Sequence, residues 1–220
     1  VPYGETVVPI SSSQVQELVI ENNEVTPKEW HIKQVIREPA LWLIVLIGVT
    51  NYYAFGTIIA HQVAYLRDIG FSAIVAALVF SLLSGMSVIG RFGFGVLSLR
   101  INLRKLVIAS FVMQVSALLL LLMTKNPNLI YLYAVLFGIG SGAIVVSLPT
   151  VVGEYFGRTH YPQIMGFIFP IVISAESMGP FIAGVIYDTT TTYTIAFVII
   201  ASVSFLGLIC AVFLRPPKRL

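Results

Sequence analysis

Residues 85–105 read GMSVIGRFGFGVLSLRINLRK, and the fold follows from this stretch. A lone arginine, Arg91, lies inside an apolar run that ends in a short basic turn at residues 100–105. The helix rise from Arg100 back to Arg91 is about 13 Å, and the hydrocarbon core of a bilayer is about 30 Å thick. If Arg100 lies at one interface, Arg91 lies near the midplane. A guanidinium costs at least about 2.5 kcal/mol there, so we interpret Arg91 as a candidate functional residue.

The composition is that of a membrane protein. The 220 residues are 57% hydrophobic and 10% charged, whereas about a quarter of the residues of a soluble domain are charged. Six apolar segments follow one another, each near the length of about twenty residues that a membrane-spanning helix needs. We therefore expect an all-α protein in the lipid bilayer, with transmembrane helices at about 39–65, 72–98, 103–124, 128–152, 162–187 and 192–214.

The positive charges predict the orientation of the six helices. Six crossings place both ends of the chain on one side, and that side holds ten of the thirteen Lys and Arg residues. An excess of Lys and Arg marks the cytoplasmic side, so we expect both termini of a multi-pass protein of the plasma or cytoplasmic membrane to be cytoplasmic. The net charge of +3 is spread over loops and does not indicate a nucleic-acid partner. The ten residues are Lys28, Lys33, Arg37, Arg100, Arg104, Lys105, Arg158, Arg215, Lys218 and Arg219.

The flanks of the helical region are polar. We interpret residues 1–38 as a cytoplasmic loop and residues 215–220 as a cytoplasmic tail. Thr26, Pro27 and Glu29 fit the N-cap, first and third positions of a helix. They predict a short helix on the membrane surface at about 27–37, for which a plain linker is the alternative. The chain begins at Val1 rather than Met, so we expect it to be a fragment of a longer protein.

Two segments of the chain resemble each other. GRFGFGVLSL begins at Gly90 and GPFIAGVIYD begins at Gly179, and both carry Gly-Val at the same distance from their first residue. We therefore expect helices one to three to be repeated as helices four to six. Because three is an odd number, the two repeats would have inverted topology, a plan that recurs in transporters.

The loop after the second helix carries a known family pattern. Major facilitator transporters have Gly-x-x-x-Asp-Arg-x-Gly-Arg-Arg/Lys there, with Leu99 and Asn102 of this chain in place of the aspartate and the second glycine. The chain thus resembles the C-terminal half, helices seven to twelve, of a major facilitator superfamily transporter. Residues 1–38 would take the place of the central cytoplasmic loop. The residues that match the pattern are Gly95, Ser98, Arg100, Arg104 and Lys105.

Within this superfamily the chain most resembles the branch of monocarboxylate transporters and oxalate/formate antiporters. The resemblance lies in residues 89–95, in residues 179–188 with Tyr193 and Phe197, and in His61 with Tyr65 and Asp68-Ile-Gly. It implies that Arg91 binds the substrate carboxylate, as the arginine of helix eight does in that branch. Ser87 and Glu176 stand where other members have an aspartate and a lysine, so a singly charged or zwitterionic substrate is expected rather than a dianion. The resemblance also implies a missing N-terminal six-helix half as the partner of this chain.

Polar residues inside the apolar segments form the candidate site. Glu176 lies about 18 Å of helix before Asp188, deep enough to meet Arg91. Glu176 could bind and release protons, and so could His61, because an imidazole changes charge near neutral pH. A permanent ion pair between Arg91 and Glu176 is the alternative. We predict substrate contacts by Arg91, Glu176, Tyr53, Asn51, Ser87 and Ser141, proton coupling or gating by Glu176 or His61, and pore lining by Tyr52.

The sequence shows no catalytic constellation, Cys/His metal spacing or glycine-rich phosphate loop, so we expect no enzyme, cofactor or metal site. We predict a secondary active transporter of small organic anions, similar to monocarboxylates, that works by alternating access with protons as a candidate coupling ion. Two alternatives stay open. One is a non-transporting membrane sensor or assembly subunit with the same fold. The other is a transporter of neutral or cationic solutes in which Arg91 pairs with Glu176.

Overall fold

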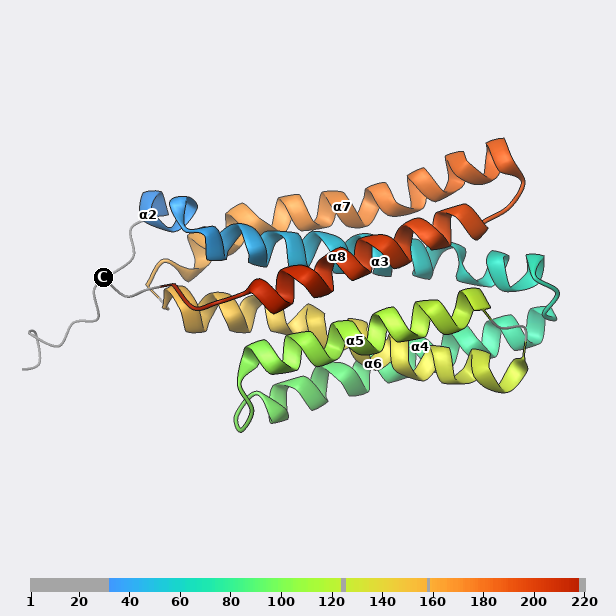
Figure 1. Ribbon diagram of the computed structural model, residues 1–220, viewed down its shortest axis with the longest axis horizontal. Helices are drawn as coiled ribbons and strands as arrows, with labels where there is room; N and C mark the ends of the chain where they lie inside the picture. The colour runs from blue at the N-terminus through green and yellow to red at the C-terminus, as the bar shows by residue number, and fades with distance from the viewer. Residues whose placement is uncertain (1–31, 124–125, 158, 218–220) are drawn as a thin grey trace, which may run out of the picture.

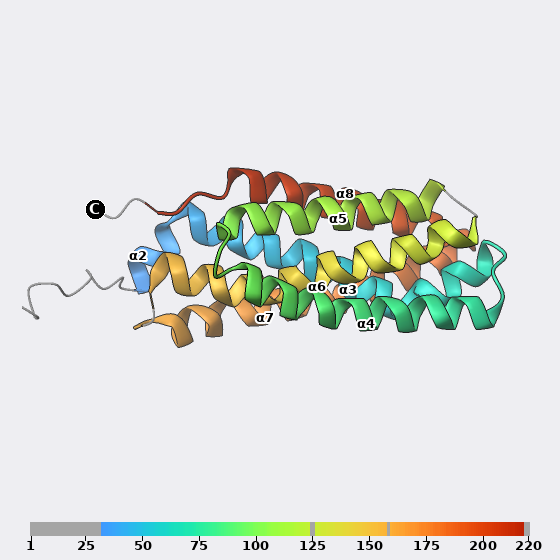
Figure 2. The same cartoon turned by 90° about the horizontal axis from the view of Figure 1, so that it is seen from below.

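Six long helices run along one common axis in the computed structural model, which describes residues 32–123, 126–157 and 159–217 (Figure 1). A short helix, α2, precedes them. The chain ends of the helical domain lie at the same end of the bundle, and a view turned by 90° shows the same arrangement (Figure 2). The expected all-α fold with six apolar helices is confirmed. The bounds are α2 Ile32–Arg37, α3 Pro39–Asp68, α4 Ala73–Leu97, α5 Leu103–Met123, α6 Pro127–Phe156, α7 Tyr161–Thr190 and α8 Thr194–Phe213.

Local chemistry explains where several helices begin and end. The Ser72 hydroxyl accepts a hydrogen bond from the Val75 amide at 3.3 Å and caps α4. Helix α6 continues past residue 152, where we expected its end, until Gly157 turns the chain with a φ of 79°. Helix α7 likewise continues past residue 187 to Thr191, which has a φ of 56°. Of the helix expected at 27–37, residues 27–31 lie outside the described residues.

The six helices form two triplets with the same packing pattern. Helix α3 packs against α7 and α8, helix α6 packs against α4 and α5, and α5 meets α8. The pattern is unchanged when α3, α4 and α5 are exchanged with α6, α7 and α8. Equivalent helices of the two repeats are also buried to a similar extent. Of the residues in the most apolar stretch of each helix, 56% are buried in both α3 and α6, 39% in both α5 and α8, and 28% and 22% in α4 and α7. The structure therefore contains the expected pair of inverted repeats.

Glycines bring the backbones of α4 and α6 into direct contact. A Cβ atom added at Gly90 would meet the backbone oxygen of Ile139, and one added at Gly142 would meet the backbone oxygen of Ser87. Small residues permit this close approach of membrane helices, where van der Waals packing is the main source of association. The contact fixes α4 against α6 at the level of Gly90.

The exchange of repeats turns this contact into an equivalent one between α7 and α3. A Cβ atom at Gly179 would meet the backbone oxygen of Tyr53, and one at Gly56 would meet the backbone oxygen of Glu176. The similarity of the segments that begin at Gly90 and Gly179 thus has a structural cause. In the exchange of repeats Ser87 corresponds to Glu176, Gly90 to Gly179, Tyr53 to Ile139 and Gly56 to Gly142.

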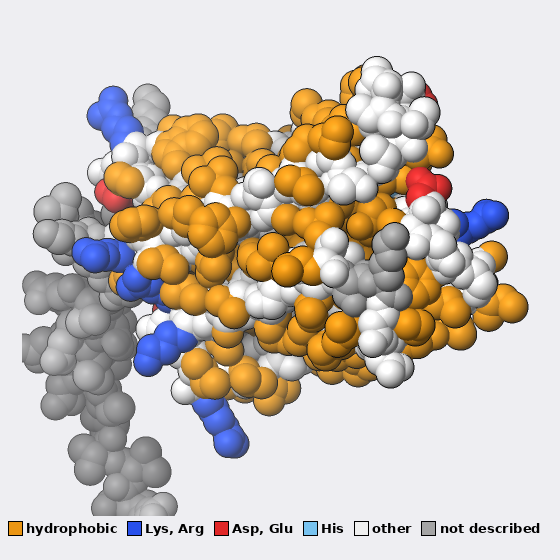
Figure 3. Space-filling view, turned by 45° about the vertical axis from the view of Figure 1, so that its right-hand side comes forward, with side chains coloured by type: hydrophobic (Ala, Val, Ile, Leu, Met, Phe, Trp, Pro, Cys, Tyr) orange, Lys and Arg blue, Asp and Glu red, His pale blue; other side chains and the backbone are white. Residues whose placement is uncertain are grey.

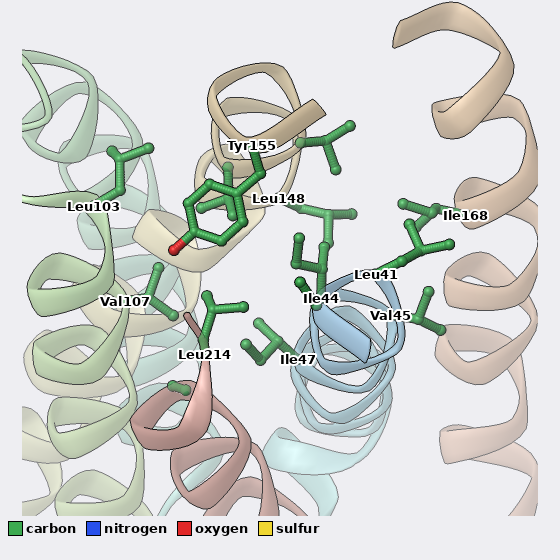
Figure 4. Packing of buried hydrophobic residues seen from close by; sticks show 14 of the residues in the cluster. Leu41, Ile44, Val45, Ile47, Leu103, Val107, Leu148, Tyr155, Ile168 and Leu214 are labelled. Carbon is green, nitrogen blue, oxygen red and sulfur yellow. The ribbon is translucent and has the colours of Figure 1, made fainter. Parts of the chain in front are cut away.

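Two apolar cores fill the bundle, one toward each end. Figure 4 shows the first, where Ile44 of α3, Leu148 of α6 and Leu214 after α8 point toward one another. The second contains Leu83 and Phe197, both fully buried. These cores hold the helices that carry the polar residues described below.

The outer surface of the bundle is apolar along its middle and charged at its ends. Lys and Arg side chains gather at one end, on the left in Figure 3, while orange apolar side chains cover the middle. We call this end, with Arg37, Arg100, Arg104, Lys105 and Arg215, the basic end. The opposite end carries Arg67 with Asp68 and Asp188.

Candidate substrate site

Arg91 lies on the open face of α4. Its side chain is exposed, and the neighbouring Val88 and Phe92 are exposed as well, Phe92 to 75%. One helical turn earlier, Ser87 is buried against α6. Arg91 therefore presents its guanidinium from an apolar surface rather than from the interior of the bundle.

Glu176 lies on α7, where that helix touches α3. Its side chain is half-buried, and its Cγ atom lies against Gly56. Pro180, one turn later, has no N–H group to bond to the carbonyl oxygen of Glu176. That oxygen is the atom that a Cβ at Gly56 would meet. The missing side chain at Gly56 and the missing donor at Pro180 together place Glu176 beside α3.

Tyr52 is half-buried on α3, one helical turn before Gly56 and so on the face of α3 that meets Glu176. Arg91 and Glu176 form no ion pair with each other, although both belong to the described part of the chain. The three residues thus lie on three different helices, Arg91 on α4, Glu176 on α7 and Tyr52 on α3.

Three other predicted contact residues lie inside the bundle. Asn51 is fully buried, and neither its amide nitrogen nor its amide oxygen has a hydrogen-bond partner among the described residues. Ser87 is buried, and its hydroxyl is likewise unpaired within the described structure. The Ser141 hydroxyl donates to the Gly138 carbonyl oxygen at 3.3 Å. Tyr53 is half-buried and meets Gly179 through its main chain. Asn51, Ser87 and Ser141 are thus buried between helices, whereas Arg91 is exposed.

His61 joins three helices near the end opposite the basic end. Its Nε2 lies 3.1 Å from the Pro180 carbonyl oxygen of α7, and its Nδ1 lies 3.2 Å from the Tyr193 hydroxyl at the start of α8. Because a carbonyl oxygen only accepts, Nε2 carries the hydrogen, and Nδ1 of a neutral ring accepts from the Tyr193 hydroxyl. The two rings also pack with centroids 5.1 Å apart. His61 thus ties α3 to both α7 and α8.

The Tyr193 hydroxyl keeps its proton in this setting. Burial raises the pKa of Tyr193, and Tyr187, Asp68 and Asp188 add to the rise because a negative phenolate would lie near them. Tyr187 also stacks on the Tyr193 ring with centroids 4.3 Å apart. Tyr193 therefore remains a hydrogen-bond donor to His61 at neutral pH.

The basic loop motif connects the ends of several helices. The Asn102 side chain accepts from the Arg104 amide at 2.9 Å and so caps α5, a role open to Asn but not to the glycine of the family pattern. The Arg104 guanidinium donates to the Val212 carbonyl oxygen near the end of α8. The Ser98 hydroxyl donates to the Gly95 carbonyl oxygen at 2.8 Å, whereas Arg100 and Lys105 are exposed at the basic end.

The comparison with known proteins agrees with this architecture. The family model described as Major Facilitator Superfamily matches residues 41–220. Monocarboxylate transporter 12 of Mus musculus is 27% identical over 172 residues, which cover 76% of this chain and 35% of that protein. The protein of the same name from Xenopus laevis is 26% identical over 178 residues, or 79% of this chain and 38% of that protein. The chain thus spans little more than a third of the length of these relatives.

Solved structures show the same fold. The crystal structure of peptide transporter POT in complex with sulfate matches with a TM-score of 0.70 at 15% sequence identity. The match covers 79% of this chain and 37% of that chain. A structure of the POT E310Q mutant with alafosfalin matches with a TM-score of 0.69. Because the family match takes in all six long helices, the chain belongs to the major facilitator superfamily, as a multi-pass membrane protein that covers one half of such a transporter.

Proposed function

We propose that this chain forms the C-terminal half of a secondary active transporter for small organic anions similar to monocarboxylates. The observation that carries the proposal is the unpaired Arg91 on the open face of α4, in a surface that is otherwise apolar. The names of the monocarboxylate transporters that the chain matches support the substrate class. The N-terminal six-helix half, from the same polypeptide, would cover this face and complete the cavity.

The guanidinium of Arg91 suits a carboxylate. Its planar fork can donate two parallel hydrogen bonds to the two carboxylate oxygens, and it stays charged at any physiological pH. A carboxylate bound there also removes the cost of an unpaired cation in the membrane. The two halves would then rock about the bound anion and expose it to each side in turn. The basic end, with its excess of Lys and Arg, would face the cytoplasm and carry both chain ends.

Proton coupling belongs to this proposal through two residues. Glu176 carries a half-buried carboxyl group on α7, and His61 links α3 to α7 and α8 through groups that change role when the imidazole gains a proton. A second proton on the ring would turn Nδ1 from an acceptor into a donor, and the Tyr193 hydroxyl would have to turn with it. An imposed pH gradient across a vesicle membrane tests this, because acid outside should accelerate uptake.

The proposal is tested by uptake of labelled lactate, formate and oxalate into proteoliposomes that hold the full-length protein. Arg91→Ala should lower lactate uptake about 100-fold, as expected for the loss of charge-assisted hydrogen bonds to the substrate. Arg67→Ala removes the same charge at the end of α3 and should leave uptake unchanged. Gel filtration and melting temperature show whether each variant is folded. A folded parent protein that moves none of the three acids would contradict the proposal and favour a sensor or assembly role.

A further inference from the structure

We infer that the basic end carries a binding site for an anionic phospholipid, at the seam where α5 meets α8. Three cations form the site: Arg104 and Lys105 at the start of α5, and Arg215 just after α8. We call these three residues the basic seam. The ligand is a glycerophospholipid whose phosphate meets the cations and whose acyl chains lie along the two helices. The inference rests on the proposed function only in placing the basic end at the cytoplasmic leaflet, which is rich in anionic lipids.

Arg104 is fixed at the point where the two helices meet. Its guanidinium donates to the Val212 carbonyl oxygen in the last turn of α8, where helix carbonyl groups lack partners within the helix. Its Nε atom is buried and has no hydrogen-bond partner among the described residues. A guanidinium has five N–H donors, so most of the donors of Arg104 are unused in the described chain. Arg104 is therefore held in a fixed place with donors to spare.

The two other cations adjoin this point. Lys105 is exposed and begins the lipid-facing stripe of α5, which continues through Val112 and Leu119. Arg215 is exposed and follows Leu214, whose side chain lies beside Val107 of α5 (Figure 4). The chain after α8 thus runs beside the first turns of α5. Three positive charges therefore gather where α8 ends and α5 begins.

No carboxylate of the described chain pairs with these charges. Residues 95–105 and 209–217 contain no Asp or Glu, and Leu99, where the major facilitator pattern has an aspartate, is 85% exposed. The described acidic residues at the basic end are Glu38 and Glu154, and neither forms an ion pair within the described residues. A phosphate diester would supply the missing negative charge, and a guanidinium can bind it through two parallel hydrogen bonds.

The surface beside the cations is apolar, which favours a lipid over a soluble phosphate. Phe213 is 64% exposed at the end of α8, and Val212 and Ile101 are exposed as well. Figure 3 shows basic side chains directly beside apolar ones at this end of the bundle. Acyl chains would cover these apolar side chains while the phosphate reaches the cations, as in basic pockets between transmembrane helices. A soluble phosphate would leave the apolar side chains uncovered.

The test measures lipid affinity with the purified full-length protein in a neutral detergent. A fluorescent phosphatidylglycerol is bound and then displaced with unlabelled phosphatidylglycerol or phosphatidylcholine of the same chain length. We expect phosphatidylglycerol to bind at least about tenfold more tightly, because the choline group cancels the charge of the phosphate in the other lipid. Lys105→Gln combined with Arg215→Gln should lower the affinity for phosphatidylglycerol about tenfold or more. Arg104 and its bond to Val212 stay in place in this variant.

Arg37→Gln combined with Arg100→Gln is the matched control. It removes the same charge from the same end of the bundle but leaves the basic seam intact, so the affinity should stay within about twofold of the parent value. Gel filtration and melting temperature show whether each variant is folded. If the double variant of the basic seam does not fold, Arg215→Gln alone, which lies outside the helices, should lower the affinity about threefold or more.

Three results would overturn the inference. One is an equal affinity of the parent protein for the two lipids. Another is an equal loss of affinity in the seam variant and its control, because a diffuse attraction of anionic lipid to the basic end does not depend on which cations remain. The third is displacement of the labelled lipid by inorganic phosphate as effective as that by phosphatidylglycerol. Lactate uptake is measured separately in phosphatidylcholine vesicles, so a folded protein that binds the lipid but moves no acid would contradict the proposed function alone.

Discussion

The two repeats share a backbone contact but differ in the side chains placed on it. The contact of α4 from the first repeat with α6 surrounds Ser87, whose small side chain is buried. The equivalent contact of α7 from the second repeat with α3 surrounds Glu176, whose larger side chain is half-buried beside Gly56. Glycines thus give both repeats the same backbone contact, whereas different side chains at equivalent positions give each repeat different chemistry.

The next equivalent pair makes the same point. Arg91 follows Gly90, and Pro180 follows Gly179. Arg91 carries a charge to the open face of α4, whereas Pro180 offers its carbonyl oxygen to His61 at 3.1 Å. One repeat therefore supplies the carboxylate site of the proposed transporter, and the other supplies a polar tie between helices. The two repeats thus share their backbone arrangement but not the chemistry of the side chains at equivalent positions.

The largest expected effect comes from adding one methyl group to the shared contact. Gly142→Ala and Gly56→Ala each place a Cβ against a backbone oxygen of the facing helix. Helix backbones cannot move aside as a flexible side chain can, so we expect each change to destabilise the protein by about 3 kcal/mol, at the upper end for overpacking. Thermal unfolding of the purified protein in detergent measures this loss. Similar losses in the two variants would show that the repeats are mechanically equivalent.

Gly93→Ala is the matched control on α4. No described atom outside the local chain lies within 4 Å of a Cβ at this glycine. A glycine inside a helix costs about 0.5–1 kcal/mol relative to alanine, so the variant should be slightly more stable than the parent. If Gly142→Ala behaves like Gly93→Ala, the close contact between α4 and α6 is wrong.

A smaller change in stability, a gain rather than a loss, is expected from Asn51→Leu. Asn51 lies where Phe137 lies in the second repeat, and both side chains are fully buried. The amide has no partner in the described structure, so replacing it with an apolar side chain of similar size should stabilise the protein by about 1–3 kcal/mol. The melting temperature in detergent checks the sign.

Gln62→Leu provides the contrast, because the side-chain oxygen of Gln62 has a partner, although its amide nitrogen has none among the described residues. Its side-chain oxygen accepts from the buried Tyr133 hydroxyl at 3.2 Å. Removing that oxygen leaves the hydroxyl unpaired, so this variant should lose stability where Asn51→Leu gains it. A loss of stability in Asn51→Leu as well would mean that the Asn51 amide is satisfied by a group such as a bound water.

The sequence predicted the helices and their repeat better than it predicted the helix ends and the neighbours of each polar side chain. Length and apolar content gave six spans, and two glycine-led segments indicated the repeat. The ends of α6 and α7 were missed because they depend on the left-handed turns at Gly157 and Thr191, which apolar periodicity does not reveal. Depth in the membrane predicted that Glu176 could meet Arg91, but α4 packs on α6 and α7 packs on α3, and the two residues form no ion pair in the described chain.

The choice between neighbouring polar residues also needed the structure. Tyr52 and Tyr53 are adjacent, and a helix turns by about 100° between them, so only one can face Glu176. Glu176 lies against Gly56, and Tyr52 lies on the same face of α3 one turn earlier, so Tyr52 is the tyrosine on the side of Glu176. The burial of Asn51 depends on the crossing of α3 with other helices, which the sequence alone does not give.

The smallest expected loss of stability is at the hydrogen bond between His61 and Tyr193. Tyr193→Phe removes the hydroxyl that donates to His61 Nδ1 but keeps the ring that stacks on Tyr187. We expect a loss of about 0.5–1.5 kcal/mol, the usual net value of one hydrogen bond. Tyr187→Phe alters the neighbouring ring of the same stack and should change the melting temperature less. Equal effects of the two changes would show that the hydrogen bond to His61 adds no stability of its own.

The same variant carries a pH dependence whose sign follows from its pKa. The folded pKa of Tyr193 is raised above the ordinary value of 10.0, so the folded state holds this proton more tightly than the unfolded state does. Stability from this group is therefore complete below pH 10 and is lost as the pH rises through the folded pKa. The parent protein should lose more stability than Tyr193→Phe between neutral pH and pH values above 10. Parallel unfolding curves for the two proteins would mean that Tyr193 is free to ionise in the folded state, and the hydrogen bond to His61 would then lose its fixed donor.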